Sequence, residues 1–280
     1  MEYTKNNCII TREQRFSKIQ NFSLLSDVFM SVALNDVPAC QHVLRILTGH
    51  KNLLLKKVHT QYTISKISAH SSRLDVFAES EEGTLYNLEI QRKDTVDHEH
   101  RTRFYSALID GESLEKGTDY DQLPDVHIFY ISEKDLQKAG KTIYPVEQAL
   151  GGTDILYEDG RHITYVNTAV DDGSEIAKLM RYFKTADPYD MSQGDLSKRV
   201  HFLKCEEGGY DLMCNVTDQF IQIGKDYGIK EGIKEGIKEG IKVCKKETAT
   251  NLAAMGMTLD LIAKAVGETC PVVKQWLESA

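Results

Sequence analysis

The chain has 280 residues, of which 41% are hydrophobic, and its formal net charge is -8 at pH 7. This composition is that of an ordinary globular protein, and it excludes the chain-wide positive field that marks many nucleic-acid-binding proteins. Any contact with nucleic acid must therefore be local.

The cysteines and the N-terminal segment indicate where the protein works. The six cysteines are scattered without a C-x-x-C pair, which suits neither a zinc site nor a disulfide framework. The first residues lack the apolar stretch of a signal peptide, and no segment approaches the roughly 18 apolar residues of a membrane helix. We therefore expect reduced thiols, a cytoplasmic location and no contact with membranes.

The first half of the chain changes from helical to strand periodicity. Over residues 27–49 apolar side chains recur about every 3.6 residues, broken at Pro38 and closed by Gly49, which predicts two short helices. The period then drops to two. This predicts an antiparallel meander of three strands, at about residues 57–67, 73–79 and 85–92.

Helical spacing returns after the meander, with Phe104 and Leu108 four residues apart and Gly111 just after the expected end. The apolar run "PDVHIFYIS" then predicts a strand buried on both faces. The resulting order is α-β-β-β-α-β, a mixed α/β fold. Beyond it we expect a short strand in "HITYVNTAV", helices near 174–184 and 209–227, and a polar linker over 184–198.

The C-terminal part contains a four-residue repeat, "GIKEGIKEGIKEGIK", over residues 228–242. As a helix it is a semi-flexible spacer or a self-association surface, because glycine at every fourth position lets two backbones approach closely. The tail after it has three short helical patterns, compatible with a helix-turn-helix or with a small packing module. We therefore expect a main domain at 1–225, a repeat helix or linker at 226–247 and a helical tail at 248–280.

Two acids and an amide stand at a suggestive spacing in "RLDVFAESEEGTLYNLEIQRK", residues 73–93. If the hairpin turns near Glu82, residues whose numbers sum to 164 lie opposite each other, so Asp75 faces Glu89 with about 5 Å between their Cβ atoms. Gln91 projects to the same side as Glu89. Two carboxylates so close repel unless a cation lies between them, and Mg²⁺ prefers such oxygen ligands. The alternative is a surface hairpin whose acids are merely solvated.

These residues, with the segments "RTRFYSALID", "VHIFYIS", "DVFMSVALND" and "AVDDGSEIAKLMRYFKTADPYD", resemble the PD-(D/E)XK nuclease superfamily. The closer resemblance is to its family of transposases and recombination-promoting nucleases, over about residues 22–225. It implies a restriction-endonuclease-like core and a DNA endonuclease dependent on Mg²⁺ or Mn²⁺. It also implies that Asp75 and Glu89 bind the metal, that Gln91 stands at the usual lysine position, and that Asp36, or else Asp27, is an assisting acid.

Gln91 is the departure from the general motif that matters chemically. A lysine can stabilise developing negative charge, whereas a neutral amide only donates and accepts hydrogen bonds and could orient the attacking water. Lys93, Arg92 and Arg103 are candidates for the missing charge, with ordinary surface cations as the alternative. Further accessory candidates are Gln61, in the preceding strand, and Tyr105, in the following helix.

The leading hypothesis is therefore a catalytic nuclease in which Asp75, Glu89 and Gln91 form the active site and DNA is the substrate. The other hypothesis is a catalytically weak or inactive module that keeps the nuclease fold for DNA association or oligomerisation. Self-association through the C-terminal repeat is compatible with either.

Overall fold

The computed structural model describes residues 12–278 apart from 65–71, 93–96, 115 and 118. The chain divides into two compact units, Met1–Thr217 and Asp218–Ala280. Among the described residues, none of the helices combines the length and the apolar character that crossing a bilayer requires.

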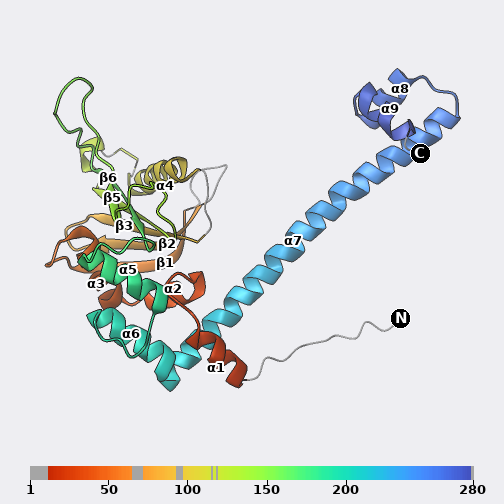
Figure 1. Cartoon of the computed structure of the whole chain (residues 1–280). Coiled ribbons are helices and arrows are strands. Elements are labelled where there is room, and N and C mark those ends of the chain that lie inside the picture. The colour runs from red at the N-terminus through yellow and green to blue at the C-terminus, as the bar shows by residue number, and fades with distance from the viewer. Residues whose placement is uncertain (1–11, 65–71, 93–96, 115, 118, 279–280) are drawn as a thin grey trace. The chain divides into compact units, whose positions relative to one another are not determined.

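Unit 1 is built on a six-stranded mixed sheet with the strand order β1-β2-β3-β4-β6-β5 (Figure 1). The first three strands form the expected antiparallel meander, whereas β3, β4 and β6 run parallel and β5 pairs antiparallel at the edge. The central strand β4 is almost entirely buried, as its apolar run predicts. The strands are β1 (Leu55–Ile64), β2 (Ser72–Ser80), β3 (Leu85–Gln91), β4 (Val126–Ser132), β5 (Ile143–Pro145) and β6 (Arg161–Asn167).

Helices cover both faces of this sheet. Figure 1 shows α4 on one side and α2, α3, α5 and α6 on the other, and each side has its own apolar cluster. The expected α/β fold is confirmed. The bounds of these helices are α1 (Arg12–Gln20), α2 (Asp27–Ala33), α3 (Val37–Thr48), α4 (His98–Ser113), the 3₁₀ helix η1 (Tyr120–Gln122), α5 (Glu175–Thr185) and α6 (Gly194–Cys205).

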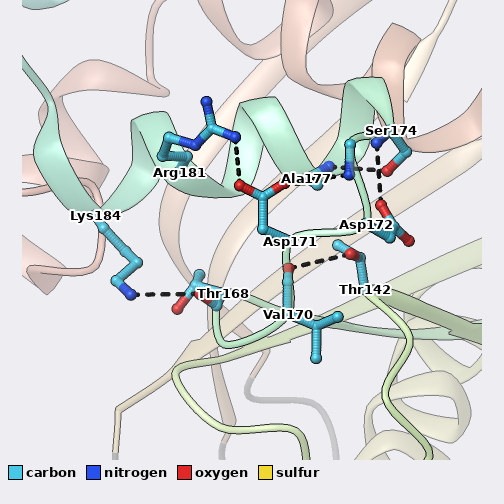
Figure 2. A network of polar contacts seen from close by, with 10 residues as sticks. Thr142, Thr168, Val170, Asp171, Asp172, Ser174, Ala177, Arg181 and Lys184 are labelled. Carbon is cyan, nitrogen blue, oxygen red and sulfur yellow. Dashed lines mark hydrogen bonds and ion pairs between the residues drawn. The ribbon is translucent and has the colours of Figure 1, made fainter.

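A polar network fixes the start of α5 beside the edge of the sheet (Figure 2). The Ser174 side chain caps the helix by accepting the amide of Ala177 at 3.1 Å, and Thr142 donates its hydroxyl to the carbonyl of Val170 at 3.1 Å. Asp171 forms an ion pair with Arg181, two turns into the helix. The loop after β6 is thereby tied to the helix that follows it.

Two local expectations are wrong. The linker expected at 184–198 gives way to α6 from Gly194 onward. Its apolar residues Leu196, Val200 and Leu203 recur at helical spacing and are fully buried, so packing outweighs the polar composition of the segment. Helix α4 also continues past Gly111 to Ser113, because glycine disfavours a helix interior by only about 1 kcal/mol.

The C-terminal region consists of helices joined by short turns where it is described. Helix α7 (Glu207–Ala254) contains both expected boundaries, at 225/226 and 247/248, and α8 (Leu259–Val266) and α9 (Cys270–Glu278) follow it. Unit 2 has a small core of its own, made by the last turns of α7 together with α8 and α9. The buried members are Ala249, Ile262, Ala263, Val266 and Val273.

Candidate active site

The β2–β3 hairpin has the predicted register. Its ladder pairs Phe77 with Asn87 and Val76 with Leu88, and both pairs of residue numbers sum to 164. The hairpin turns through Gly83, whose φ of 89° lies in the left-handed region that favours glycine. The same register places Asp75 across from Glu89.

The backbone hydrogen bonds between β2 and β3 end before Asp75 and Glu89. At these two residues the side-chain carboxylates accept the amide hydrogens of the opposite strand instead. The last paired residues are Val76 and Leu88. Beyond them the amide of Ile90 donates to Oδ2 of Asp75 at 2.9 Å, and the amide of Asp75 lies 3.4 Å from Oε1 of Glu89. Each carboxylate thus accepts from the opposite strand, and the two acids are held against each other where the strands separate.

Burial disfavours the ionised form of both acids. Glu89 is 4% exposed, and desolvation together with the charge of Asp75 raises its pKa. Desolvation also raises the pKa of Asp75, against the opposing effect of the hydrogen bond from Ile90. The pair therefore resists holding two negative charges at neutral pH unless a cation joins it.

Gln91 is in contact with a cation, Arg101 of α4. Nη1 of Arg101 donates to Oε1 of Gln91 at 3.2 Å, and Nη2 donates to the hydroxyl of Tyr105 at 2.8 Å. The hydroxyl of Tyr105 in turn hydrogen-bonds Glu89. Residues 91, 101, 105 and 89 thus form one connected polar network, which joins β3 to α4.

Two further amides adjoin the acids. Asn87, fully buried on the same face of β3, donates Nδ2 to Oε1 of Glu89 at 3.1 Å. Gln61 lies between residues paired with Val76 and Leu74, and hence across from Asp75 on β1. In the described part of the chain neither side-chain polar atom of Gln61 has a hydrogen-bond partner, and its φ is 56°. An unpartnered amide on a strained backbone beside an acid is typical of functional sites.

The structure separates the two acids considered for the assisting role. Asp36 caps α3 by accepting the amide of Ala39 at 3.1 Å, and its charge acts on Arg199 of α6. Asp27, the first residue of α2, is the acid whose charge raises the pKa of Asp75. It is Asp27, our alternative, that lies within electrostatic reach of the site.

Two of the cations expected to replace the missing lysine, Arg92 and Arg103, lie among the described residues, and neither is hydrogen-bonded to Gln91. Arg103 is exposed on α4, and Arg92 forms an ion pair with Glu133 at 3.0 Å. Lys93 lies outside the described residues. Among the described residues, Arg101 is a cation that does contact Gln91. The spacing of Arg101 and Tyr105, four residues apart in a predicted helix, is the signal that could have revealed it.

The donor chemistry of this site fits a divalent cation. Asp75 and Glu89 offer hard oxygen ligands, and a cation between them would offset both the repulsion and the cost of burial. Among the described residues no three His, Cys, Asp or Glu side chains gather closely enough to hold a metal. Asp27 is therefore not placed as a third ligand, and the two acids would hold a cation together with water or substrate oxygens.

Comparison with known families assigns this arrangement to a class. The model of the PD-(D/E)XK nuclease family transposases matches residues 51–167. The expected resemblance is confirmed over this region. The PD-(D/E)XK region contains all six strands, α4 and the acids of the hairpin, and it leaves α1–α3 and everything after β6 outside. No curated protein and no solved structure matched the chain.

The match supports a nuclease or transposase function, and PD-(D/E)XK nucleases in general use divalent metal ions. It also makes DNA the implied substrate.

Proposed function

We propose that the protein is a Mg²⁺- or Mn²⁺-dependent DNA endonuclease of the transposase and recombination-promoting type, which hydrolyses phosphodiester bonds. The observation that carries this proposal is the pair Asp75 and Glu89. These are two acids in a buried setting, held together where the β2–β3 ladder ends, inside the region that matches the nuclease family. Without a cation, two ionised carboxylates in this setting destabilise the fold.

Asp75 and Glu89 are the residues that would hold the metal. When bound there, Mg²⁺ or Mn²⁺ supplies a lowered pKa for a bound water and positive charge for the phosphodiester oxygens. The chain's own residues keep the ligands in place. The amide of Ile90 and the side chains of Asn87 and Tyr105 hold the two carboxylates.

Arg101 determines which end of the Gln91 amide is available. A guanidinium has donors only, so it binds Oε1 of Gln91 and leaves the Nε2 hydrogens for another partner. Gln91 is then a donor to a water or phosphate oxygen, with a fixed positive charge directly behind it. Together Gln91 and Arg101 supply the two properties that a lysine combines, a donor and a charge. Tyr105 assists by binding Arg101 and Glu89 at once.

Cleavage of supercoiled plasmid DNA tests the proposal. We expect nicked or linear product with Mg²⁺ or Mn²⁺ and intact plasmid with chelator. Asp75→Asn and Glu89→Gln keep the shape of the site but remove a metal ligand, and each should abolish cleavage. Asp121→Asn, at an exposed acid of η1, is the matched control and should cleave like the wild type. Intact plasmid after long incubation of folded wild-type protein with either metal would exclude the catalytic function.

The competing function is a catalytically weak module that binds DNA or oligomerises. The neutral side chain at position 91 favours it. So does the finding that, among the described residues, no third His, Cys, Asp or Glu joins the two acids in a metal-binding group. Gel-shift titrations in chelator separate the two functions when combined with the cleavage assay. Such a module binds DNA with a salt dependence set by its phosphate contacts and never cleaves it.

We also propose a role for each part of the chain. We assign nuclease activity to 1–225, self-association to the helix at 226–247 and an accessory packing or DNA-contacting role to 248–280. A cytoplasmic location is proposed because the five cysteines within the described residues are free thiols.

A further inference from the structure

The repeat places one kind of side chain along each line of α7. Ile229, Ile233, Ile237 and Ile241 form an isoleucine stripe whose members are between 54% and 61% exposed. Gly228, Gly232, Gly236 and Gly240 form a glycine stripe beside it. A row of half-exposed isoleucines on a helix is an exposed apolar surface, and such surfaces commonly mark sites of interaction.

No atom of the described residues packs closely against the glycine stripe. A Cβ added at any glycine of the stripe would meet no atom within 4 Å, and none of the four has a positive φ. Glycine also weakens a helix interior relative to alanine. Their benefit must therefore come from something outside the chain that approaches the backbone closely.

A groove beside the glycine stripe has room for such an approach. It has a volume of about 1050 Å³ and is lined on one side by residues of the repeat, including Gly232 and Gly236. On the other side are Val272 and Trp276 of α9, in the same unit. The groove thus sets the glycines opposite two apolar side chains, and charged side chains of the repeat, among them Glu235 and Lys238, line it as well.

We propose that the repeat helix of a second copy of this chain packs against the glycine and isoleucine stripes. The two helices run in the same direction, from N- to C-terminus, and cross at an angle. Residues four apart form the ridges that interdigitate when two helices cross at about -50°. Small residues on such ridges allow the closest approach. In this arrangement the isoleucine stripe of each copy packs over the glycine stripe of the other, which covers both.

The charges decide between parallel and antiparallel pairing. With about 100° between successive residues, the lysines lie on the isoleucine side of the apolar surface and the glutamates on the glycine side. A two-fold axis along parallel helices brings the lysine flank of one copy against the glutamate flank of the other. The antiparallel arrangement instead brings lysine to lysine and glutamate to glutamate. The flanks concerned are Lys234, Lys238 and Lys242, and Glu235 and Glu239.

The same charges disfavour DNA as the occupant. Each lysine of the repeat is followed directly by a glutamate through Glu239, so no extended basic strip faces a phosphate backbone.

A charge-exchanged full-length chain tests both the partner and the direction. It carries Lys234→Glu, Lys238→Glu, Lys242→Glu, Glu235→Lys and Glu239→Lys. When this variant pairs with itself in parallel, the contacts between the exchanged positions stay attractive. When it pairs with the wild type, the same contacts become repulsive. Sedimentation equilibrium should therefore show dimers of similar affinity for each chain alone. Mixed dimers, captured by differently tagged copies, should be about tenfold weaker.

Preferential formation of mixed dimers would overturn the parallel arrangement. A wild-type chain that stays monomeric at its highest soluble concentration would overturn self-association altogether. Neither result depends on whether the protein cleaves DNA.

A second variant separates close packing from helix stability. Gly232→Ala with Gly236→Ala should raise the helicity seen by circular dichroism, because alanine is the better helix former. It should at the same time weaken the dimer about tenfold, because the added methyl groups keep the backbones apart. If the dimer instead becomes tighter as helicity rises, the glycine stripe is not the contact surface.

Discussion

Replacing Arg101 with methionine tests how an amide can stand where a lysine is usual. Methionine keeps an unbranched apolar stem of suitable size but removes the hydrogen bonds to Gln91, at 3.2 Å, and to Tyr105, at 2.8 Å. A hydrogen bond to a charged group contributes roughly 1.5–3 kcal/mol. If about 2 kcal/mol of this is realised in the transition state, the cleavage rate falls about 30-fold.

The assay is single-turnover cleavage of a labelled duplex at saturating Mg²⁺, with Arg103→Met as the matched control. Arg103 is an exposed arginine two residues away on the same helix, so its loss should leave the rate within about twofold of the wild type. Equal rates for Arg101→Met and Arg103→Met would refute the role of Arg101.

The combination of Arg101→Met with Gln91→Lys distinguishes this role from a purely structural one. A lysine at position 91 brings both the donor and the charge, so the double variant should cleave faster than Arg101→Met alone. In the presence of Arg101 the same lysine meets a like charge, so Gln91→Lys by itself should give little gain. Two effects that simply add would contradict the reasoning, because the residues would then act independently.

Three further predictions concern the acids and a buried lysine. Burial raises the pKa of Asp75 and Glu89, so protonation of these acids stabilises the folded state. This stabilisation is fully present below the pKa of the acids in the unfolded chain, which is about 4. It is lost as the pH rises through the folded values, so the melting temperature without metal should fall from pH 5 to pH 8 and Mg²⁺ should restore it mainly at pH 8. Asp36→Ala should cost about 1 kcal/mol in urea unfolding through loss of the α3 cap without slowing cleavage, whereas Asp27→Asn should leave stability unchanged and alter the pH profile of cleavage. Lys204→Met should lower the free energy of unfolding by about 3 kcal/mol, because three carbonyl groups that now accept from its Nζ would be left unpaired in the core.

The hairpin register could be predicted because it depends only on local chemistry. The alternation of side chains along two strands and a glycine turn between them determine which residues face each other. The prediction therefore placed Asp75 opposite Glu89, and the register of the structure does the same. The buried strand β4 was predictable for a similar reason, since a continuous apolar run suits a strand covered on both faces.

The spacing of Arg101 from Tyr105 makes it a candidate but does not by itself select it over its neighbours, because its contact with Gln91 depends on tertiary packing. Position 101 faces Gln91 only because α4 lies across the sheet with Tyr105, Leu108 and Ile109 turned inward. The sequence between β3 and α4 does not determine the rotation of the helix. Asp36 is different, since an Asp two residues before a proline is typical of a helix N-cap. That signal could have predicted its structural role, although we expected Asp36 to assist at the site.

In the proposed function, Gln91 and Arg101 together replace one lysine, and this changes what the site depends on. A lysine beside a metal and other charges can lose its proton, because an ammonium shifts its pKa readily when buried, whereas a guanidinium keeps its charge. The charge behind Gln91 is therefore constant across the pH range in which the acids titrate. In exchange, donor and charge now reside on separate elements, β3 and α4, and they meet only while α4 is packed on its apolar cluster. A change that loosens the packing of α4 should therefore slow cleavage before it unfolds the sheet. The cleavage rate would then depend on the contact between α4 and β3.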